Sequence, residues 1–334
     1  MSSSATAGRI RPRDAARVTA GCAAAGCALL LLVMDAQPLL AQAAAREYGD
    51  FPVIGSRAAV WVAAQVHLLF AAFVLGVPMF AVGCEAIGMF SRDDRYDRLS
   101  KEFTRLLLIA YSATAIWGAV LTFLLLTLYP RFWTHLSEIF AVSMWIYVGI
   151  FFLESFTLYL YYYGWDRWKY GAAKYWHLGL GVLLNVFGTA VMFIADGWLS
   201  YMMSPPAVVT PDTAPASVQL WSAIANATWM PINIHRFIAN IVFGGTVAAA
   251  YAAYRFLSAR TDEERALYDW MGYVGNFIAI SALLILPFAG YWLGREIYEF
   301  NQQMGITMMG GFMSWLWIIQ AFLIGVLFLA GNYY

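Results

Sequence analysis

Two histidines and one glutamate are the residues of this chain whose types and positions could do chemistry. His67 lies ten residues after Arg57, about 15 Å into an apolar segment at the helical rise of 1.5 Å per residue. Glu154 lies near the middle of the apolar run 141–163, and His235 lies one turn into another apolar segment. An ionisable side chain at membrane depth is costly and is usually tolerated only with a partner or a function.

The chemistry open to these side chains is iron binding and proton transfer. Imidazole is a common ligand of haem iron, although a histidine can also form a hydrogen bond across helices without binding anything. Arg236, next to His235, suits a haem propionate, and it equally suits an arginine that extends to the membrane surface. We interpret the other two histidines, His135 and His177, as interfacial side chains.

Two methionines extend the list of candidate ligands. Met309 and Met313 share one face of the segment 308–331, and either could be an axial haem ligand, although adaptable packing is the favoured interpretation. The three cysteines include no CxxC or CxxCH motif. The sequence therefore indicates neither a disulfide framework nor covalently attached c-type haem.

Composition places these residues in a membrane. The chain has 334 residues, of which 62% are hydrophobic and 12% are charged, and its mean hydropathy is +0.64. A soluble protein carries about 25% charged residues. The chain is therefore predicted to be an all-α polytopic membrane protein, and no nucleic-acid partner is expected.

The apolar segments predict the helices that position the site. We interpret residues 1–45 as an N-terminal signal or signal-anchor segment, with the uncleaved anchor favoured, and residues 46–334 as a transmembrane bundle. The connection between Gly197 and Pro231 is expected to be a loop on the outer surface. About seven transmembrane helices are predicted, at 57–83, 104–128, 139–163, 175–195, 232–256, 268–292 and 308–331.

The distribution of basic residues predicts the orientation of the bundle. With the N-terminus inside, fifteen of the 20 Lys and Arg residues fall in inner loops and flanks, as the positive-inside rule requires. We therefore expect a protein of the bacterial cytoplasmic membrane with a cytoplasmic N-terminus. The candidate haem sites would then lie toward the periplasmic side.

At this point the chain resembles subunit I of cytochrome bd quinol oxidase, over about residues 52–300. The specific part is a Phe-Phe-Leu-Glu-Ser stretch, which contains Glu154, followed at the proper separation by Gly-Trp-Asp-Arg. The stretches that carry the resemblance are Ser56-Arg57 with His67, Phe151–Ser155 with Gly164–Arg167, Asn185 with Asp196-Gly197-Trp198, and His235.

The resemblance implies a helical bundle that binds b-type haem and receives electrons near its outer face. His67 matches the ligand of a high-spin haem, of b or d type, in the oxygen-reducing pair. His235 matches an axial ligand of the low-spin haem that accepts electrons from quinol. Glu154 matches a carboxylate associated with proton delivery, and we assign Arg57 and Arg236 to the cofactor site as well.

The chain also departs from the family pattern. Ile146 stands where the family has a second glutamate, and no residues in the segment 290–311 match the lysine and glutamate of the family's quinol-binding loop, so quinone binding is left open. The family's methionine ligand would fall near Trp317, which leaves Met309 and Met313 as displaced candidates. Because the family's last helices would lie beyond Tyr334, we interpret the chain as a truncated, divergent subunit I.

Three functions follow from these observations. The first is a haem b-binding subunit of a cytochrome bd-like respiratory complex, which carries electrons between quinol and a terminal acceptor and has a second cytochrome bd-like subunit as partner. The second is an electron relay between the quinone pool and periplasmic cytochrome c, without oxygen reduction. The third is a haem-free scaffold subunit, which does not explain histidines at two intramembrane positions.

Overall fold

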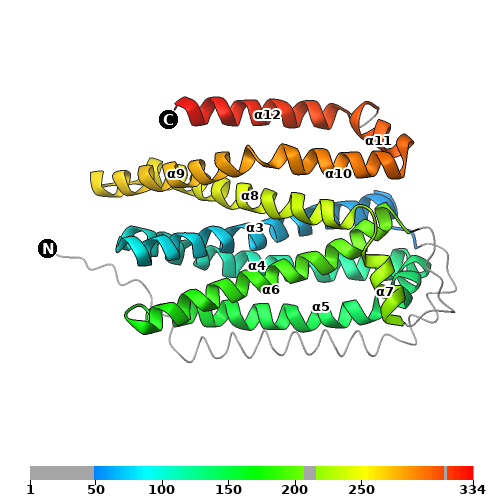
Figure 1. The fold of residues 1–334 in the computed structure, drawn as a ribbon, viewed down its shortest axis with the longest axis horizontal. Helices are drawn as coiled ribbons and strands as arrows, with labels where there is room; N and C mark the ends of the chain where they lie inside the picture. The colour runs from blue at the N-terminus through cyan, green and yellow to red at the C-terminus, as the bar shows by residue number, and fades with distance from the viewer. Residues whose placement is uncertain (1–48, 207–215, 312–313, 334) are drawn as a thin grey trace.

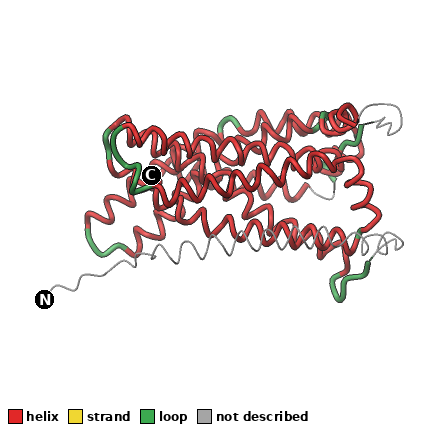
Figure 2. Tube along the Cα trace, turned by 90° about the horizontal axis from the view of Figure 1, so that it is seen from below, coloured by secondary structure: helices red, strands yellow, loops and turns green. Residues whose placement is uncertain are grey.

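The protein is a bundle of long helices that run side by side (Figures 1 and 2). The computed structural model describes residues 49–206, 216–311 and 314–333, and in these ranges it contains helices and no strands. The helices are α3 (Gly55–Ser91), α4 (Asp94–Leu128), α5 (Pro130–Gly164), α6 (Ala172–Met203), α7 (Ala216–Ile224), α8 (Trp229–Ser258), α9 (Asp262–Leu283), α10 (Leu286–Phe300), α11 (Gln302–Met309) and α12 (Ser314–Tyr333).

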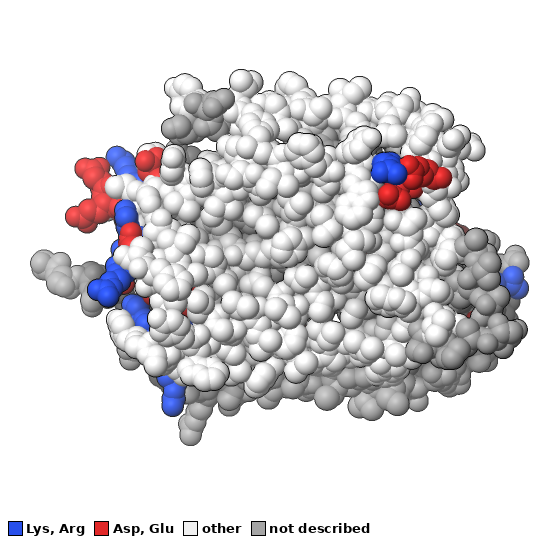
Figure 3. Space-filling view, viewed as in Figure 1, with Lys and Arg blue, Asp and Glu red and all other residues white. Residues whose placement is uncertain are grey.

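The surface of the bundle is that of a membrane protein. Within the described ranges six helical spans are long and apolar enough to cross a membrane, and a seventh is obtained if α11 and α12 form one bent span. On the face shown in Figure 3, charged side chains gather toward the two ends and leave a band without charged residues between them. A helix is favoured in hydrocarbon because it satisfies its own backbone hydrogen bonds. The predicted all-α polytopic fold is confirmed.

The observed helices are longer and more interrupted than the predicted segments. The segment 57–83 lies inside α3, which continues to Ser91. The segment 268–292 is divided between α9 and α10, and 308–331 is divided between α11 and α12. The expected outer loop contains the short helix α7, so describing it only as a loop was wrong. The predicted N-terminal segment, residues 1–45, lies outside the described residues.

Helix α3 is central because it packs against α4, α6 and α8. Glycines allow the close approach to α8, since a Cβ at Gly76 would lie 3.0 Å from the backbone nitrogen of Gly244. The next contact, between α8 and α9, is equally close at Gly245 and Gly275. Small residues at such crossings are typical of membrane helix packing. These contacts fix the position of α8, which carries His235, relative to α3, which carries His67.

Candidate functional site

His67 lies on α3 with its ring against α4. The side chain is half-buried, and Nδ1 lies 3.1 Å from the carbonyl oxygen of Thr114. A carbonyl can only accept, so Nδ1 must carry the hydrogen, and in a neutral imidazole Nε2 then keeps its lone pair. A Cβ at Gly118 would lie 3.0 Å from the ring carbon Cε1. The His67 ring is thus fixed with the hydrogen on Nδ1 and the lone pair on Nε2. A histidine that binds a metal through Nε2 commonly has this tautomer, because its Nδ1 donates to a carbonyl oxygen.

His235 lies on the second turn of α8 and is also half-buried. Within the described residues neither ring nitrogen has a hydrogen-bond partner. Gly290 of α10 faces the ring, and a Cβ placed there would lie 3.6 Å from Cδ2 and 3.7 Å from Nε2. Within the described residues His235 therefore has both ring nitrogens without a hydrogen-bond partner, and it lies beside Gly290, which has no side chain.

Arg236, the neighbour of His235, forms an ion pair with Asp196 of α6. The Asp196 side chain is fully buried and that of Arg236 is 22% exposed, so this arginine does not simply extend to the membrane surface. The other carboxylate oxygen of Asp196, Oδ2, has no partner, and neither has Oδ1 of the buried Asn233. Both atoms are acceptors, so they suit water or another donor, whereas an ionised propionate would need Arg236.

The remaining predicted haem residues are exposed or lie outside the described residues. Arg57 is exposed in the first turn of α3. Met309 is 47% exposed at the end of α11, and Met313 lies outside the described residues. The methionine ligand stays a prediction.

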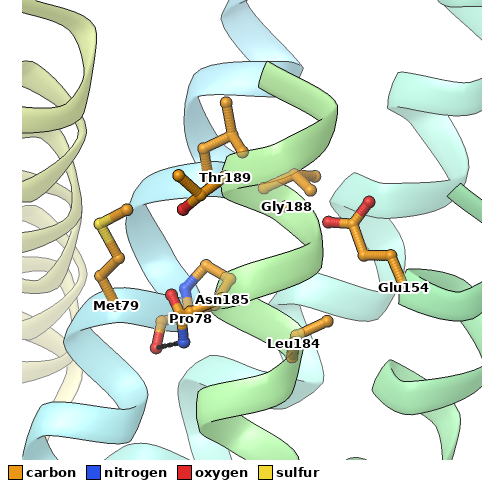
Figure 4. Close-up of a pocket in the computed structure, with 9 residues that line it drawn as sticks. Pro78, Met79, Glu154, Leu184, Asn185, Gly188 and Thr189 are labelled. Atoms are coloured by element: carbon orange, nitrogen blue, oxygen red, sulfur yellow. Dashed lines mark hydrogen bonds between the residues drawn. The ribbon is translucent and has the colours of Figure 1, made fainter. Parts of the chain in front are cut away.

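Glu154 lines a narrow pocket between α3, α5 and α6 (Figure 4). The residue is 3% exposed, and a Cβ at Gly188 would lie 2.9 Å from its Oε1. The carboxyl group therefore occupies space that exists because α6 has a glycine there. The pocket is lined by Val74, Leu75, Pro78, Met79, Glu154, Leu184, Asn185, Gly188 and Thr189.

Polar groups on three helices meet near the Glu154 pocket. Asn185 donates through Nδ2 to the carbonyl oxygens of Gly181 at 2.9 Å and Pro78 at 3.3 Å, while its buried Oδ1 has no partner. Tyr111 of α4 lies near Glu154, and its hydroxyl donates to the carbonyl oxygen of Phe151 at 3.1 Å. The pocket thus combines a buried acid with unused hydrogen-bonding capacity, which suits a group that holds a proton.

The interfacial interpretation of His177 was wrong. This histidine is 1% exposed, and Nδ1 lies 2.5 Å from Oε1 of Glu85, which is also fully buried. Glu154 is therefore not the lone acid in the interior. The available signal was Cys84-Glu85, a carboxylate within an otherwise apolar stretch that continues past the predicted end of the first helix.

The chain is similar to known proteins in sequence and in fold. A family model described as "Cytochrome bd terminal oxidase subunit I" matches residues 56–322. A "Putative cytochrome bd menaquinol oxidase subunit I" of Bacillus subtilis (strain 168) is 22% identical over 253 residues, which are 71% of this chain and 53% of that protein. The structure of bd oxidase from Geobacillus thermodenitrificans matches with a TM-score of 0.64 at 20% identity, over 74% of this chain and 56% of that chain.

These matches differ in what they establish. The structural match shows the fold, and the chain spans about half the length of the relatives it matches. The family model covers most of the chain, including His67, Glu154 and His235. The chain therefore belongs to the cytochrome bd terminal oxidase subunit I family.

Proposed function

We propose that the chain is the haem b-binding membrane subunit of a cytochrome bd-like respiratory oxidoreductase, carrying electrons between quinol and a terminal acceptor. The observation that carries this proposal is the bond between Nδ1 of His67 and the carbonyl oxygen of Thr114, because it leaves Nε2 as a ligand atom inside the bundle. Membership of the family supports haem as the cofactor.

The donor set fits haem better than a metal ion held by protein alone. Within the described ranges no three His, Cys, Asp or Glu side chains are arranged so that they could hold a metal ion, whereas a protein-held zinc ion needs three or four ligands. Iron in a porphyrin needs only one or two protein ligands. His67 and His235 each offer one, and Gly118 and Gly290 leave room for the two rings.

Each residue then has a distinct task. A bound haem would supply one-electron chemistry. His235 would hold the low-spin haem, His67 would hold a high-spin haem of b or d type, and Arg236 would share its charge between Asp196 and a propionate. Glu154 would hold and release a proton near the high-spin site, in a pocket that excludes bulk water.

A relay without oxygen reduction is the second candidate function, and one position favours it. Ile146 replaces the second glutamate of the family pattern, and its side chain is 50% exposed on α5. Without that carboxylate this exposed face of α5 has one acid fewer for proton delivery. In this case the acceptor would be a cytochrome c on the outer side, and quinol would remain the donor.

The orientation and the partner belong to the same proposal. Basic residues gather at the end of the bundle that holds the α3–α4, α5–α6 and α8–α9 connections, so we place this end in the cytoplasm of a bacterium (Figure 3). The sites of His235 and Arg236 then face the periplasm. A second cytochrome bd-like membrane subunit is the proposed partner.

A reduced-minus-oxidised spectrum of the purified complex tests the function. We expect a b-type α band, and His235→Ala should remove the low-spin part of it. His135→Ala is the matched control, because His135 is an exposed histidine of the same chain and its loss should leave the band intact. Absence of any band would leave the haem-free scaffold, and a band without oxygen consumption on addition of quinol would select the relay.

A further inference from the structure

A second group of ionisable side chains is buried at the opposite end of the bundle from His235. Glu85 of α3, Tyr161 of α5 and His177 of α6 are each at most 1% exposed. Lys174 and Asp97 cover them, with side chains that are 7% and 13% exposed. Burying so many ionisable groups is costly unless they satisfy one another.

The hydrogen bonds of His177 determine where a proton must lie. Nε2 lies 2.8 Å from the carbonyl oxygen of Tyr161, which can only accept, so Nε2 carries a hydrogen. Nδ1 lies 2.5 Å from Oε1 of Glu85. Two bare acceptors would repel each other at that distance, so one proton lies between Nδ1 and Oε1. The pair is either an imidazolium with a carboxylate or a neutral imidazole with a carboxylic acid.

We propose that Glu85 and His177 form a proton-binding site, which holds a single proton between the carboxyl oxygen and Nδ1 at the inner end of the bundle. This site is separate from the haem residues and from Glu154, and its existence does not depend on the proposed electron transfer. The proton would come from the aqueous phase at that end and return to it or pass inward.

The surrounding charges explain why the proton is held. Lys174 Nζ lies 2.9 Å from Oε1 of Glu85 and 2.8 Å from Oδ1 of Asp97. With the proton in place, Lys174 and the shared proton balance the two carboxylates, and the cluster is neutral. Loss of the proton would leave one net negative charge in a buried position, which is unfavourable. Tyr161 adds a bond by donating to Oε2 of Glu85 at 2.5 Å.

Aromatic rings shield the Glu85–His177 site from water. The ring of Trp165 lies edge-on to the His177 ring, and the ring of Tyr161 stacks on it. Both ring centroids lie 4.5 Å from the centroid of the His177 ring. Tyr161 follows Glu154 by seven residues, about 10 Å along α5 at the helical rise. The proton is therefore stored about two helical turns from Glu154 along α5.

The proton can be located in the unaltered protein. The chain has four histidines, so ¹⁵N labelling of histidine in the full complex gives few signals for magnetic resonance, and infrared absorption reports whether Glu85 is a carboxylic acid. We expect at neutral pH either both nitrogens of His177 protonated with Glu85 ionised, or Glu85 protonated with a neutral His177. A singly protonated His177 together with an ionised Glu85 at neutral pH would overturn the proposal.

Two opposite charge changes provide a second test. Asp97→Asn removes a negative charge and should lower the pH at which the pair releases its proton, while Lys174→Met removes a positive charge and should raise it. The shift for Lys174→Met should be about one to three pH units, as for a charge in direct contact with a titrating group, and the shift for Asp97→Asn should be smaller, because Asp97 contacts Lys174 and not the pair. Glu102→Gln is the control, because that carboxylate of α4 is bonded to Tyr251 and not to the pair. Shifts in the same direction, or none, would contradict a proton-binding role.

Discussion

The three intramembrane histidines differ in how many of their ring nitrogens the protein uses. His177 has both nitrogens engaged, by Glu85 and by the Tyr161 carbonyl. His67 has one engaged, by the Thr114 carbonyl, and His235 has none within the described residues. Only a nitrogen with a free lone pair can bind iron. The difference assigns His177 to proton chemistry and leaves His67 and His235 as the candidate ligands.

The ion pairs at the two ends show the same contrast. At the inner end Lys174 lies between two carboxylates, and Glu85 uses both of its oxygens. At the outer end Asp196 pairs with Arg236 but keeps a buried oxygen without a partner. A complete network holds helices together, whereas an incomplete one in a buried position is a place for a further group. The inner end is thus complete by itself, and the outer end is not.

The largest effect should come from filling the space beside His235. A Cβ at Gly290 would already be in van der Waals contact with the His235 ring, so the larger side chain of Gly290→Leu would fill the space next to it. A haem could then no longer approach Nε2. We expect most of the low-spin b-type absorbance to be lost while the protein still folds. The measurement is haem content per chain together with circular dichroism of the purified complex.

The control for this prediction lies one turn further along α10. A Cβ at Gly294 meets no atom within 4 Å, so Gly294→Leu makes the same chemical change away from the ring. Equal haem loss in both variants would mean that the helix, and not the space beside His235, is responsible. Full haem content in Gly290→Leu would argue against His235 as a ligand.

Breaking the inner network should have the next largest effect, on stability. Glu85→Ala leaves the buried His177 without its carboxylate and leaves Lys174 with Asp97 alone, and removal of one member of a buried ion pair costs about 3–5 kcal/mol. We expect a marked fall in the thermal unfolding temperature of the purified complex, followed by circular dichroism. An unchanged temperature would show that the network contributes little to the free energy of unfolding.

A smaller effect is expected at Glu154, and it should fall on turnover. Gly188→Ala would place a methyl group 2.9 Å from the present position of Oε1 and displace the carboxyl group. A displacement of about 1 Å can slow a reaction up to about 100-fold. Glu154→Gln should slow proton-coupled turnover with quinol in the same way, and both variants should keep the low-spin haem spectrum.

Gly179→Ala is the matched control on the same helix, because its Cβ would meet no atom within 4 Å. Turnover in this variant should equal that of the unaltered protein. If Gly188→Ala or Glu154→Gln removed the low-spin spectrum, Glu154 would have a structural role. If neither changed turnover, the pocket would have no part in proton transfer.

Sequence patterns predicted much of this arrangement, for physical reasons that can be stated. Apolar runs long enough to span a membrane locate the helices, and a charge inside such a run stands out, as Glu154 does. Helix ends are less certain, because α3 continues beyond its apolar run through Cys84 and Glu85. Glu85 was therefore overlooked as a residue near a helix end.

The role of His177 could not be predicted because it depends on side chains distant in sequence. Glu85 precedes His177 by 92 residues, and nothing local to either one shows that they meet. The same holds for Gly290 beside His235 and for Gly118 beside His67, since a glycine matters there through the space it leaves. Tertiary packing decides which polar groups find partners, and this decides which remain available for a cofactor.

The smallest effect should come from an ion pair at the same inner end but on the surface. Lys101 Nζ lies 2.6 Å from Oδ1 of Asp166, and the two side chains are 41% and 81% exposed. Solvent screens such a pair, so Lys101→Gln should change the free energy of unfolding by about 1 kcal/mol or less. Comparison of Lys101→Gln with Glu85→Ala in the same unfolding assay shows whether burial or short distance makes an ion pair stabilising. The ion pairs of both residues are short, but only those of the buried Glu85 should be needed for stability. A loss as large as that of Glu85→Ala would mean that the inner end is held together by its surface charges as much as by the buried network.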